Sequence, residues 1–226
     1  MKKQFTILTI LVSALLLSCE PNIVFESPMP PKGKTLNAIP AEFIGVYLCE
    51  SDSAYMIVSD DVVYREYHYK FNTTFKKIED SENCAIEEGQ IKLPYREECV
   101  PFEHIEGDSI AATLHEIDTL FNFRKNEVLK LYKGRLFINV QDKNKHWMTQ
   151  MVTPMEERWL KWEMIELPDE LENLDDITTS YKTRTTKRKR TQFIVNPTHI
   201  EFEKLLIKKY LSECDILIPQ SPQLLF

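Results

Sequence analysis

The segment DVVYREYHYKFN, residues 61–72, carries the clearest structural signal in this chain. Aromatic residues at its centre alternate with charged or imidazole residues: Tyr67, Tyr69 and Phe71 against Glu66, His68 and Lys70. Successive side chains of a β-strand point to opposite faces, so this alternation is typical of a strand that is buried on one face. The segment therefore predicts a half-buried strand whose aromatic side chains point inward.

Comparable segments lie before and after this strand. They are short, apolar and separated by polar turns: FIGVYLCE (43–50), SAYMIVS (53–59), EVLKLYKGRLFINV (127–140), KHWMTQMV (145–152) and RWLKWEMIEL (158–167). The third of them predicts a hairpin that turns at Lys133 and Gly134, because glycine tolerates a positive φ. Strands at this spacing predict a mainly β chain, in which an antiparallel meander forms a barrel or sandwich.

The C-terminal region has a different pattern. Thr198, with Glu201 three residues later, forms the sequence of a capping box. Apolar residues then recur at helical spacing, namely Phe202, Leu205, Leu206 and Tyr210. The sequence predicts one C-terminal helix, about 198–213, that packs on the sheet, and a last strand in CDILIP (214–219).

The first residues have the pattern of an export signal. Lys2 and Lys3 precede the apolar run FTILTILVSALLL (5–17). That run is too short for a membrane-spanning helix, which needs roughly 20 residues. Cys19 follows the run, and Glu20 comes directly after it. This order of basic start, apolar run and single cysteine resembles a bacterial lipoprotein signal with its lipobox.

The resemblance implies that residues 1–18 are a lipoprotein signal peptide and that Cys19 is the lipidation site. Fatty acyl chains such as palmitate on Cys19 would then anchor the protein in a membrane of the cell envelope. An outer-membrane location is expected, at the periplasmic face or the cell surface. With segments such as IPAEFIGVY (39–47) and NPTHIEFEKLL (196–206), the chain also resembles uncharacterised Bacteroidetes lipoproteins, which have a β-rich body.

A proline-rich segment follows the cysteine. Residues 19–40 contain five prolines and little periodicity, which predicts a semi-rigid spacer. One β-rich domain is then expected over residues 41–226. The formal net charge of −7 argues against a nucleic-acid partner and against electrostatic docking on anionic lipid.

Four cysteines remain besides Cys19, at positions Cys49, Cys84, Cys99 and Cys214. In an oxidising envelope, an even number favours two disulfides, for which three connectivities exist. Proximity along the chain favours Cys84 with Cys99, and this pairing leaves Cys49 for Cys214.

No sequence motif indicates catalysis, a cofactor or a metal. The GDS segment at 107–109 resembles the nucleophile block of GDSL-type esterases, but the GxND and DxxH patterns of that family are missing, so turn residues are the preferred interpretation. The five histidines lack the spacing of a metal motif: His68, His104, His115, His146 and His199. The basic run from Lys182 to Arg190 fits an anionic partner or, in preference, the charged edge of a hairpin.

Two classes of function therefore stay open. The first is a non-catalytic envelope lipoprotein that binds a partner protein or small ligand. The rival is an envelope hydrolase, such as one acting on a glycan, whose site is assembled from residues far apart in the sequence. A deep pocket with two carboxylates, or with a serine and a histidine, would favour the rival. An exposed apolar patch would favour binding.

Overall fold

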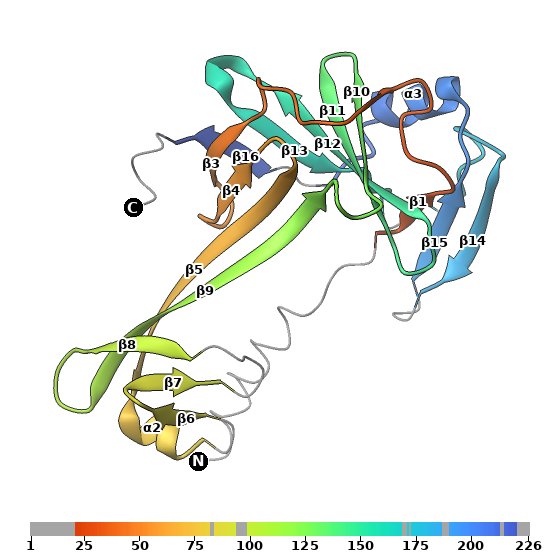
Figure 1. Ribbon diagram of the computed structural model, residues 1–226. Helices are drawn as coiled ribbons and strands as arrows, with labels where there is room; N and C mark the ends of the chain where they lie inside the picture. Colours follow the sequence, from red (N-terminus) through yellow and green to blue (C-terminus); the bar gives the residue numbers. More distant parts are fainter. Residues whose placement is uncertain are drawn as a thin grey trace. The chain divides into compact units, whose positions relative to one another are not determined.

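A computed structural model describes residues 21–81, 84–93, 99–168, 171, 173–186, 190–212 and 215–220. The predicted mainly β, antiparallel class is confirmed, and strands make up 51% of the structure. A barrel or sandwich is not confirmed. The chain forms two compact units, drawn in Figure 1. Unit 1 takes its described residues from 21–36, 126–153 and 162–212, and unit 2 from 37–125, 154–161 and 215–220. This division differs from the single domain expected over residues 41–226.

The strands that lie wholly or mostly in unit 1 are β1 (Ile23–Phe25), β2 (Lys34–Leu36), β10 (Val128–Tyr132), β11 (Arg135–Gln141), β12 (Trp147–Pro154), β13 (Leu160–Met164), β14 (Tyr181–Thr185) and β15 (Thr191–Val195). β2, β10, β11 and β12 pair in that order, all antiparallel. β12 also lies beside β13 and β1. β1 pairs in parallel with β15, and β15 forms the predicted basic hairpin with β14.

The helix α3 (His199–Ile207) covers the core of unit 1. Both hydrogen bonds of the predicted capping box are present between Thr198 and Glu201. The ring of Phe202 packs edge-on against Phe25, with centroids 6.1 Å apart. The helix is shorter than the predicted 198–213, because Lys208 caps it and Lys209 has a φ of 52°, which no α-helix continues. No helix among the described residues is both long and apolar enough to cross a membrane.

The segment predicted as a spacer, 19–40, is folded into unit 1 from its first described residues onward. Ile23, Phe25 and Met29 are fully buried among the core residues of that unit. The buried amide of Asn139 fixes the backbone of Met29, since Asn139 Oδ1 accepts from Met29 N at 2.7 Å and Nδ2 donates to Met29 O at 2.8 Å. The prolines therefore shape a packed segment, and the run IVF supplies the apolar side chains that hold it in place.

Unit 2 contains the strands β3 (Gly45–Cys49), β4 (Tyr55–Val58), β5 (Val62–Thr74), β6 (Ala85–Glu87), β7 (Gln90–Lys92), β8 (Val100–His104), β9 (Ser109–Asn122) and β16 (Asp215–Pro219). Its short helices are α2 (Phe75–Glu79) and the 3-10 turn η1 (Glu156–Arg158). The strands lie in the order β16–β3–β4–β5–β9–β8–β7–β6, with antiparallel pairing throughout. The predicted strand in CDILIP is β16, which pairs with β3.

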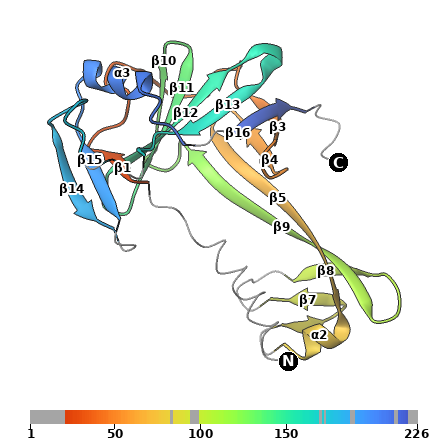
Figure 2. The ribbon, with the colours of Figure 1, turned by 180° about the vertical axis from the view of Figure 1, so that it is seen from behind.

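The longest strand pair of unit 2 is a two-stranded ribbon. β5 and β9 pair from Val62 opposite Asn122 to Thr74 opposite Ser109, and Figure 2 shows the ribbon running from β3 and β4 to β6, β7, β8 and α2. A small separate core closes its far end, made by Ile78, Ile91, Val100, Ile110 and Ala112. The ribbon thus connects two packed regions of the same unit.

Candidate functional site

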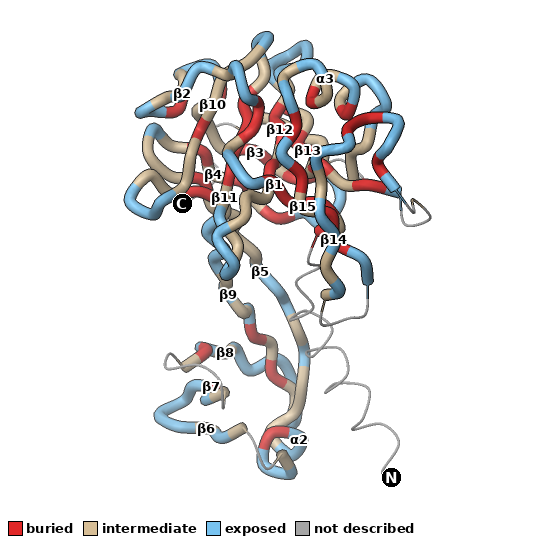
Figure 3. The backbone as a smooth tube through the Cα atoms, turned by 90° about the vertical axis from the view of Figure 1, so that its right-hand side faces the viewer, coloured by how far each residue is buried: buried red, intermediate tan, exposed pale blue. Residues whose placement is uncertain are grey.

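The centre of the β5–β9 ribbon has no buried residue on either face. Residues 64–70 of β5 and 113–119 of β9 are all intermediate or exposed, and Figure 3 shows the corresponding exposed stretch of β5. The predicted alternation of residues 61–72 is therefore confirmed, but its aromatic face is only partly buried. Phe71 packs against the small core at the far end of the ribbon, Tyr67 is half-buried and Tyr69 is exposed.

One face of this ribbon centre carries Arg65, Tyr67 and Tyr69, and we call it the aromatic face. The rings of Tyr67 and Tyr69 stack with centroids 5.5 Å apart and an interplanar angle of 6°. The guanidinium carbon of Arg65 lies 5.8 Å from the Tyr67 ring centroid, within the range of a cation–π contact. Tyr69 keeps 38% of its surface exposed. Three side chains of interface-forming types therefore stand in a row on one strand.

Arg65 is held in place from its other side. Its Nη2 lies 2.9 Å from Asp215 Oδ2 and 3.3 Å from Asp52 Oδ2. Burial alone would lower the pKa of Arg65, but Cys49 and Asp215 outweigh it and raise that pKa. Burial raises the pKa of the Tyr67 phenol, an effect that Arg65 opposes. The arginine is thus a fixed positive charge at one end of the aromatic face.

The opposite face of the ribbon brings together Glu66, His68 and His115, and we call this group the histidine cluster. His68 on β5 lies directly opposite His115 on β9. Their rings stack with centroids 4.8 Å apart. Glu66 Oε1 lies 2.5 Å from His115 Nε2 and 3.2 Å from His68 Nε2. The Tyr55 ring packs edge-on against His68, with centroids 6.3 Å apart. The sequence missed this cluster because its members come from strands whose register is set by tertiary structure.

The other histidines lie apart from this cluster. His104 Nε2 is 2.9 Å from Gly107 O, in the turn between β8 and β9. His146 belongs to a polar network of unit 1, and His199 Nε2 is 3.2 Å from the Tyr132 hydroxyl. Gly107, with a φ of 60°, and Asp108 lie in that turn, as expected for turn residues, and Ser109 begins β9.

Among the described residues, the cysteines form no disulfide. Cys49, Cys84 and Cys99 carry free thiols, whereas Cys214 and Cys19 lie outside the described residues. Cys84 precedes β6 and Cys99 precedes β8, and β7 lies between these two strands. Two strand spacings amount to about 10 Å, beyond the roughly 7 Å that a disulfide spans between Cα atoms. Cys49 faces the interior beside Arg65, and burial raises its pKa to about 11.

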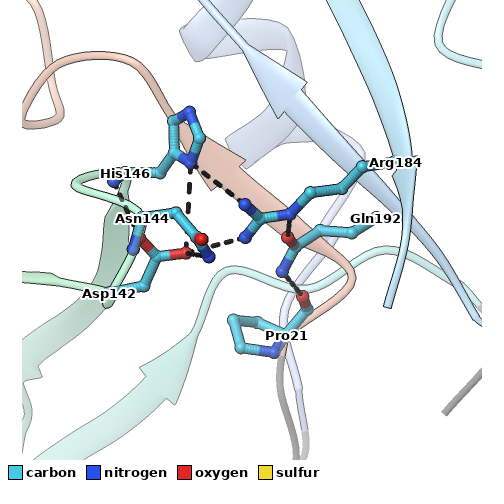
Figure 4. A network of polar contacts seen from close by, with 6 residues as sticks. All are labelled: Pro21, Asp142, Asn144, His146, Arg184 and Gln192. Carbon is cyan, nitrogen blue, oxygen red and sulfur yellow. Dashed lines mark hydrogen bonds and ion pairs between the residues drawn. The ribbon is translucent and has the colours of Figure 1, made fainter. Parts of the chain in front are cut away.

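A second polar assembly, drawn in Figure 4, lies in unit 1. Asp142 accepts from Arg184 Nη2 at 2.7 Å and from the backbone N–H of His146 at 2.9 Å. Arg184 Nε donates to Gln192 Oε1, and the buried Gln192 Nε2 donates to Pro21 O at 2.6 Å. The network ties the β14–β15 hairpin to the turn after β11 and to the first described residue. The charged groups of Asp142 and Arg184 pair with each other and hold the fold together, so this network offers no candidate catalytic group.

Two pockets in unit 1 bear on the alternative hypothesis that the protein is a hydrolase. One, of about 310 Å³, is lined by Glu166, Leu167, Pro168, Arg190, Lys209, Tyr210, Leu211 and Ser212. The other, of about 330 Å³, is lined by Tyr132, Lys133, Arg135, Phe137, Glu203, Leu206, Ile207 and Lys209. Neither lining pairs two carboxylates or a serine with a histidine. In the first, the Ser212 hydroxyl accepts from the backbone N–H of Met164 at 3.0 Å.

Comparison with known proteins adds no assignment to these sites. No protein-family model, no curated protein and no solved structure matches this chain.

Proposed function

We propose that this protein is a lipid-anchored, non-catalytic binding protein of the bacterial cell envelope that holds a partner protein on the aromatic face of unit 2. The observation that supports the binding role is the row of the partly buried Arg65 and Tyr67 and the exposed Tyr69. Tyrosine and arginine are enriched among the residues that dominate the energy of protein interfaces. A stacked tyrosine pair also loses little side-chain freedom when a partner covers it.

The fixed position of Arg65 strengthens this proposal. Its ion pairs with Asp52 and Asp215 orient the guanidinium before any partner arrives, so less conformational entropy is lost on binding. On β9, Asp118 lies opposite Arg65 and Glu116 lies opposite Tyr67. The aromatic face therefore has an acidic border, which suits a partner that presents basic side chains around an apolar centre.

The anchor completes the proposal and depends on Cys19. Only Glu20 separates Cys19 from Pro21, whose carbonyl accepts the hydrogen bond from Gln192. At roughly 3.5 Å per residue, a lipid on Cys19 would hold unit 1 within about 10 Å of the lipid headgroups. We expect this tether in the outer membrane, at the periplasmic face or the cell surface.

The test combines lipid labelling with site-specific photo-crosslinking. Cells are fed a fatty-acid analogue, and we expect label on the wild type and none on Cys19→Ala. A photo-crosslinking amino acid is then placed at position 69 and, as a matched exposed control, at position 200 in α3. We expect one discrete adduct from position 69 only, and Tyr67→Ala should weaken it when combined with that probe.

Several results would contradict the proposal. An unlabelled wild type would remove the anchor, and identical adducts from positions 69 and 200 would remove the aromatic face as the binding surface. Turnover of an envelope glycan by the purified protein, lost on changing Glu166 or Glu203, would instead support the hydrolase.

A further inference from the structure

The histidine cluster directs three potential metal ligands toward one point. Glu66, His68 and His115 each offer one potential ligand atom, and these three atoms all lie within 4.8 Å of one another. The two imidazoles come from facing positions of adjacent strands, and Glu66 lies two residues before His68 on the same face. Backbone pairing therefore fixes the Cα positions of the three residues, and only their side-chain torsion angles determine how far apart the ligand atoms lie.

The separations fit a small ion bound between the ligands. With bonds of about 2.0–2.1 Å to nitrogen and oxygen, two ligand atoms of a tetrahedral site lie roughly 3.3 Å apart. Glu66 Oε1 and His68 Nε2 are separated by 3.2 Å, close to that value. The shorter 2.5 Å contact to His115 Nε2 would have to widen by rotation of side chains that stand at the surface. His68 and His115 are 43% and 48% exposed, so this adjustment meets little resistance.

We propose that Glu66, His68 and His115 bind one divalent transition-metal ion of the Zn²⁺ class. Two imidazoles and one carboxylate are a ligand set that this class prefers, and the carboxylate offsets part of the ionic charge. Three protein ligands leave a further coordination position on the solvent side for water or for a donor atom of another molecule. The edge-on Tyr55 ring supports the His68 imidazole from β4.

The ion would also act on the ribbon itself. It would join β5 to β9 at the place where residues 64–70 and 113–119 contribute nothing buried to a core. A ligand that binds only the folded state stabilises that state, so the ribbon centre should open less often when the ion is bound. The site is independent of the proposed partner binding, since it lies on the other face of the ribbon and does not involve Cys19.

The direct test is calorimetric titration with Zn²⁺ of the chain from residue 20 onward, after its accessible thiols have been blocked with N-ethylmaleimide. We expect one ion per chain. His68→Asn and His115→Asn should each weaken binding at least about tenfold, because replacing even an outer partner of a metal ligand costs roughly 10–100-fold. His104→Asn is the matched control, an exposed histidine of the same unit, and should bind as the wild type does.

Hydrogen exchange on the wild type provides a second test, which remains valid if a variant fails to fold. In the wild type, Zn²⁺ should slow exchange of the central amides of β5 and β9, and it should leave the exchange of α3 unchanged. Absence of Zn²⁺ binding by the wild type would overturn the proposal. So would unchanged affinity in the His68→Asn, His115→Asn double variant, or a loss in His104→Asn as large as in the cluster variants.

Discussion

Asp142 is the side chain on which the turn at residues 142–146 and its link to Arg184 depend. Burial opposes its charge, but hydrogen bonds from the backbone of His146 and from Arg184 outweigh burial and lower the pKa of Asp142. A carboxyl whose folded pKa lies below the unfolded value stabilises the fold above that value and loses this contribution as the pH falls. We expect Asp142→Asn to lower the free energy of unfolding by about 1–3 kcal/mol at pH 7.

Urea unfolding at pH 7 and at about pH 3 measures this effect. The difference between wild type and Asp142→Asn should shrink at the lower pH, because protonation of the carboxyl in the unfolded state removes part of the stability that the ionised folded carboxyl contributes. Asp176→Asn is the control, because the Asp176 side chain is 90% exposed and its ion pair with Lys208 should contribute little. Equal losses in both variants would show that Asp142 is not the central residue of the network.

Cys49 provides a second test at a single position. Burial raises its pKa to about 11, although the neighbouring Arg65 opposes the shift. Because the thiolate is the reactive form, Cys49 should react with iodoacetamide at pH 8 far more slowly than Cys84 or Cys99. Mass spectrometry of the alkylated native protein over time gives the three rates. The folded pKa exceeds that of the unfolded thiol, so this group should also destabilise the fold as the pH rises from about 9 to about 11.

Among the elements, α3 depends on its first turn. The Thr198 hydroxyl accepts from Glu201 N at 3.4 Å, and Glu201 Oε2 accepts from Thr198 N at 2.7 Å, a contact that lowers the pKa of Glu201. Losing a Thr cap costs about 1 kcal/mol, so Thr198→Ala should lower the melting temperature of unit 1, into whose core α3 inserts Phe202 and Leu205. Thr198→Ser should restore most of the loss, and a full deficit in Thr198→Ser would point to packing of the methyl group instead.

The capping box of α3 and the β5–β9 ribbon also show how much of the structure could be predicted from the sequence. The capping box and the alternation around Tyr67 and Tyr69 are local patterns, and both were predicted correctly. The exposure of Tyr69 and the meeting of His68 with His115 depend on which strands pair and on what covers them. Nothing within a few residues of either histidine contains that information, because β5 and β9 are joined through the whole of α2, β6, β7 and β8.

At the level of the whole molecule, the composition of the N-terminal segment led to a wrong prediction, that of a spacer. Five prolines within residues 19–40 are typical of a linker, yet the three apolar residues of β1 outweigh them. β1 lies between β12 and β15, so its burial requires segments more than a hundred residues away in the sequence. Such a short strand has no periodicity from which the local sequence could predict it. The division of the chain into two units, each built from separated segments, escaped prediction for the same reason.

Truncation tests this organisation. A chain that begins at residue 41 lacks the fully buried Ile23, Phe25 and Met29 and the strand β2. Removing one buried Ile or Phe side chain costs about 2–5 kcal/mol, and a typical domain is stable by only about 5–15 kcal/mol in total. We therefore expect unit 1 to lose its protected amides in hydrogen exchange and its cooperative thermal transition when the chain starts at residue 41, and to keep both when it starts at residue 20.

Unchanged protection of β12 and β15 in the shorter chain would mean that residues 21–40 pack against the core without stabilising it. Those residues could then act as a spacer after Cys19. Loss of protection would mean that the anchor proposed at Cys19 is attached to the folded unit itself, so membrane distance would be set by the fold and could not be tuned by the linker.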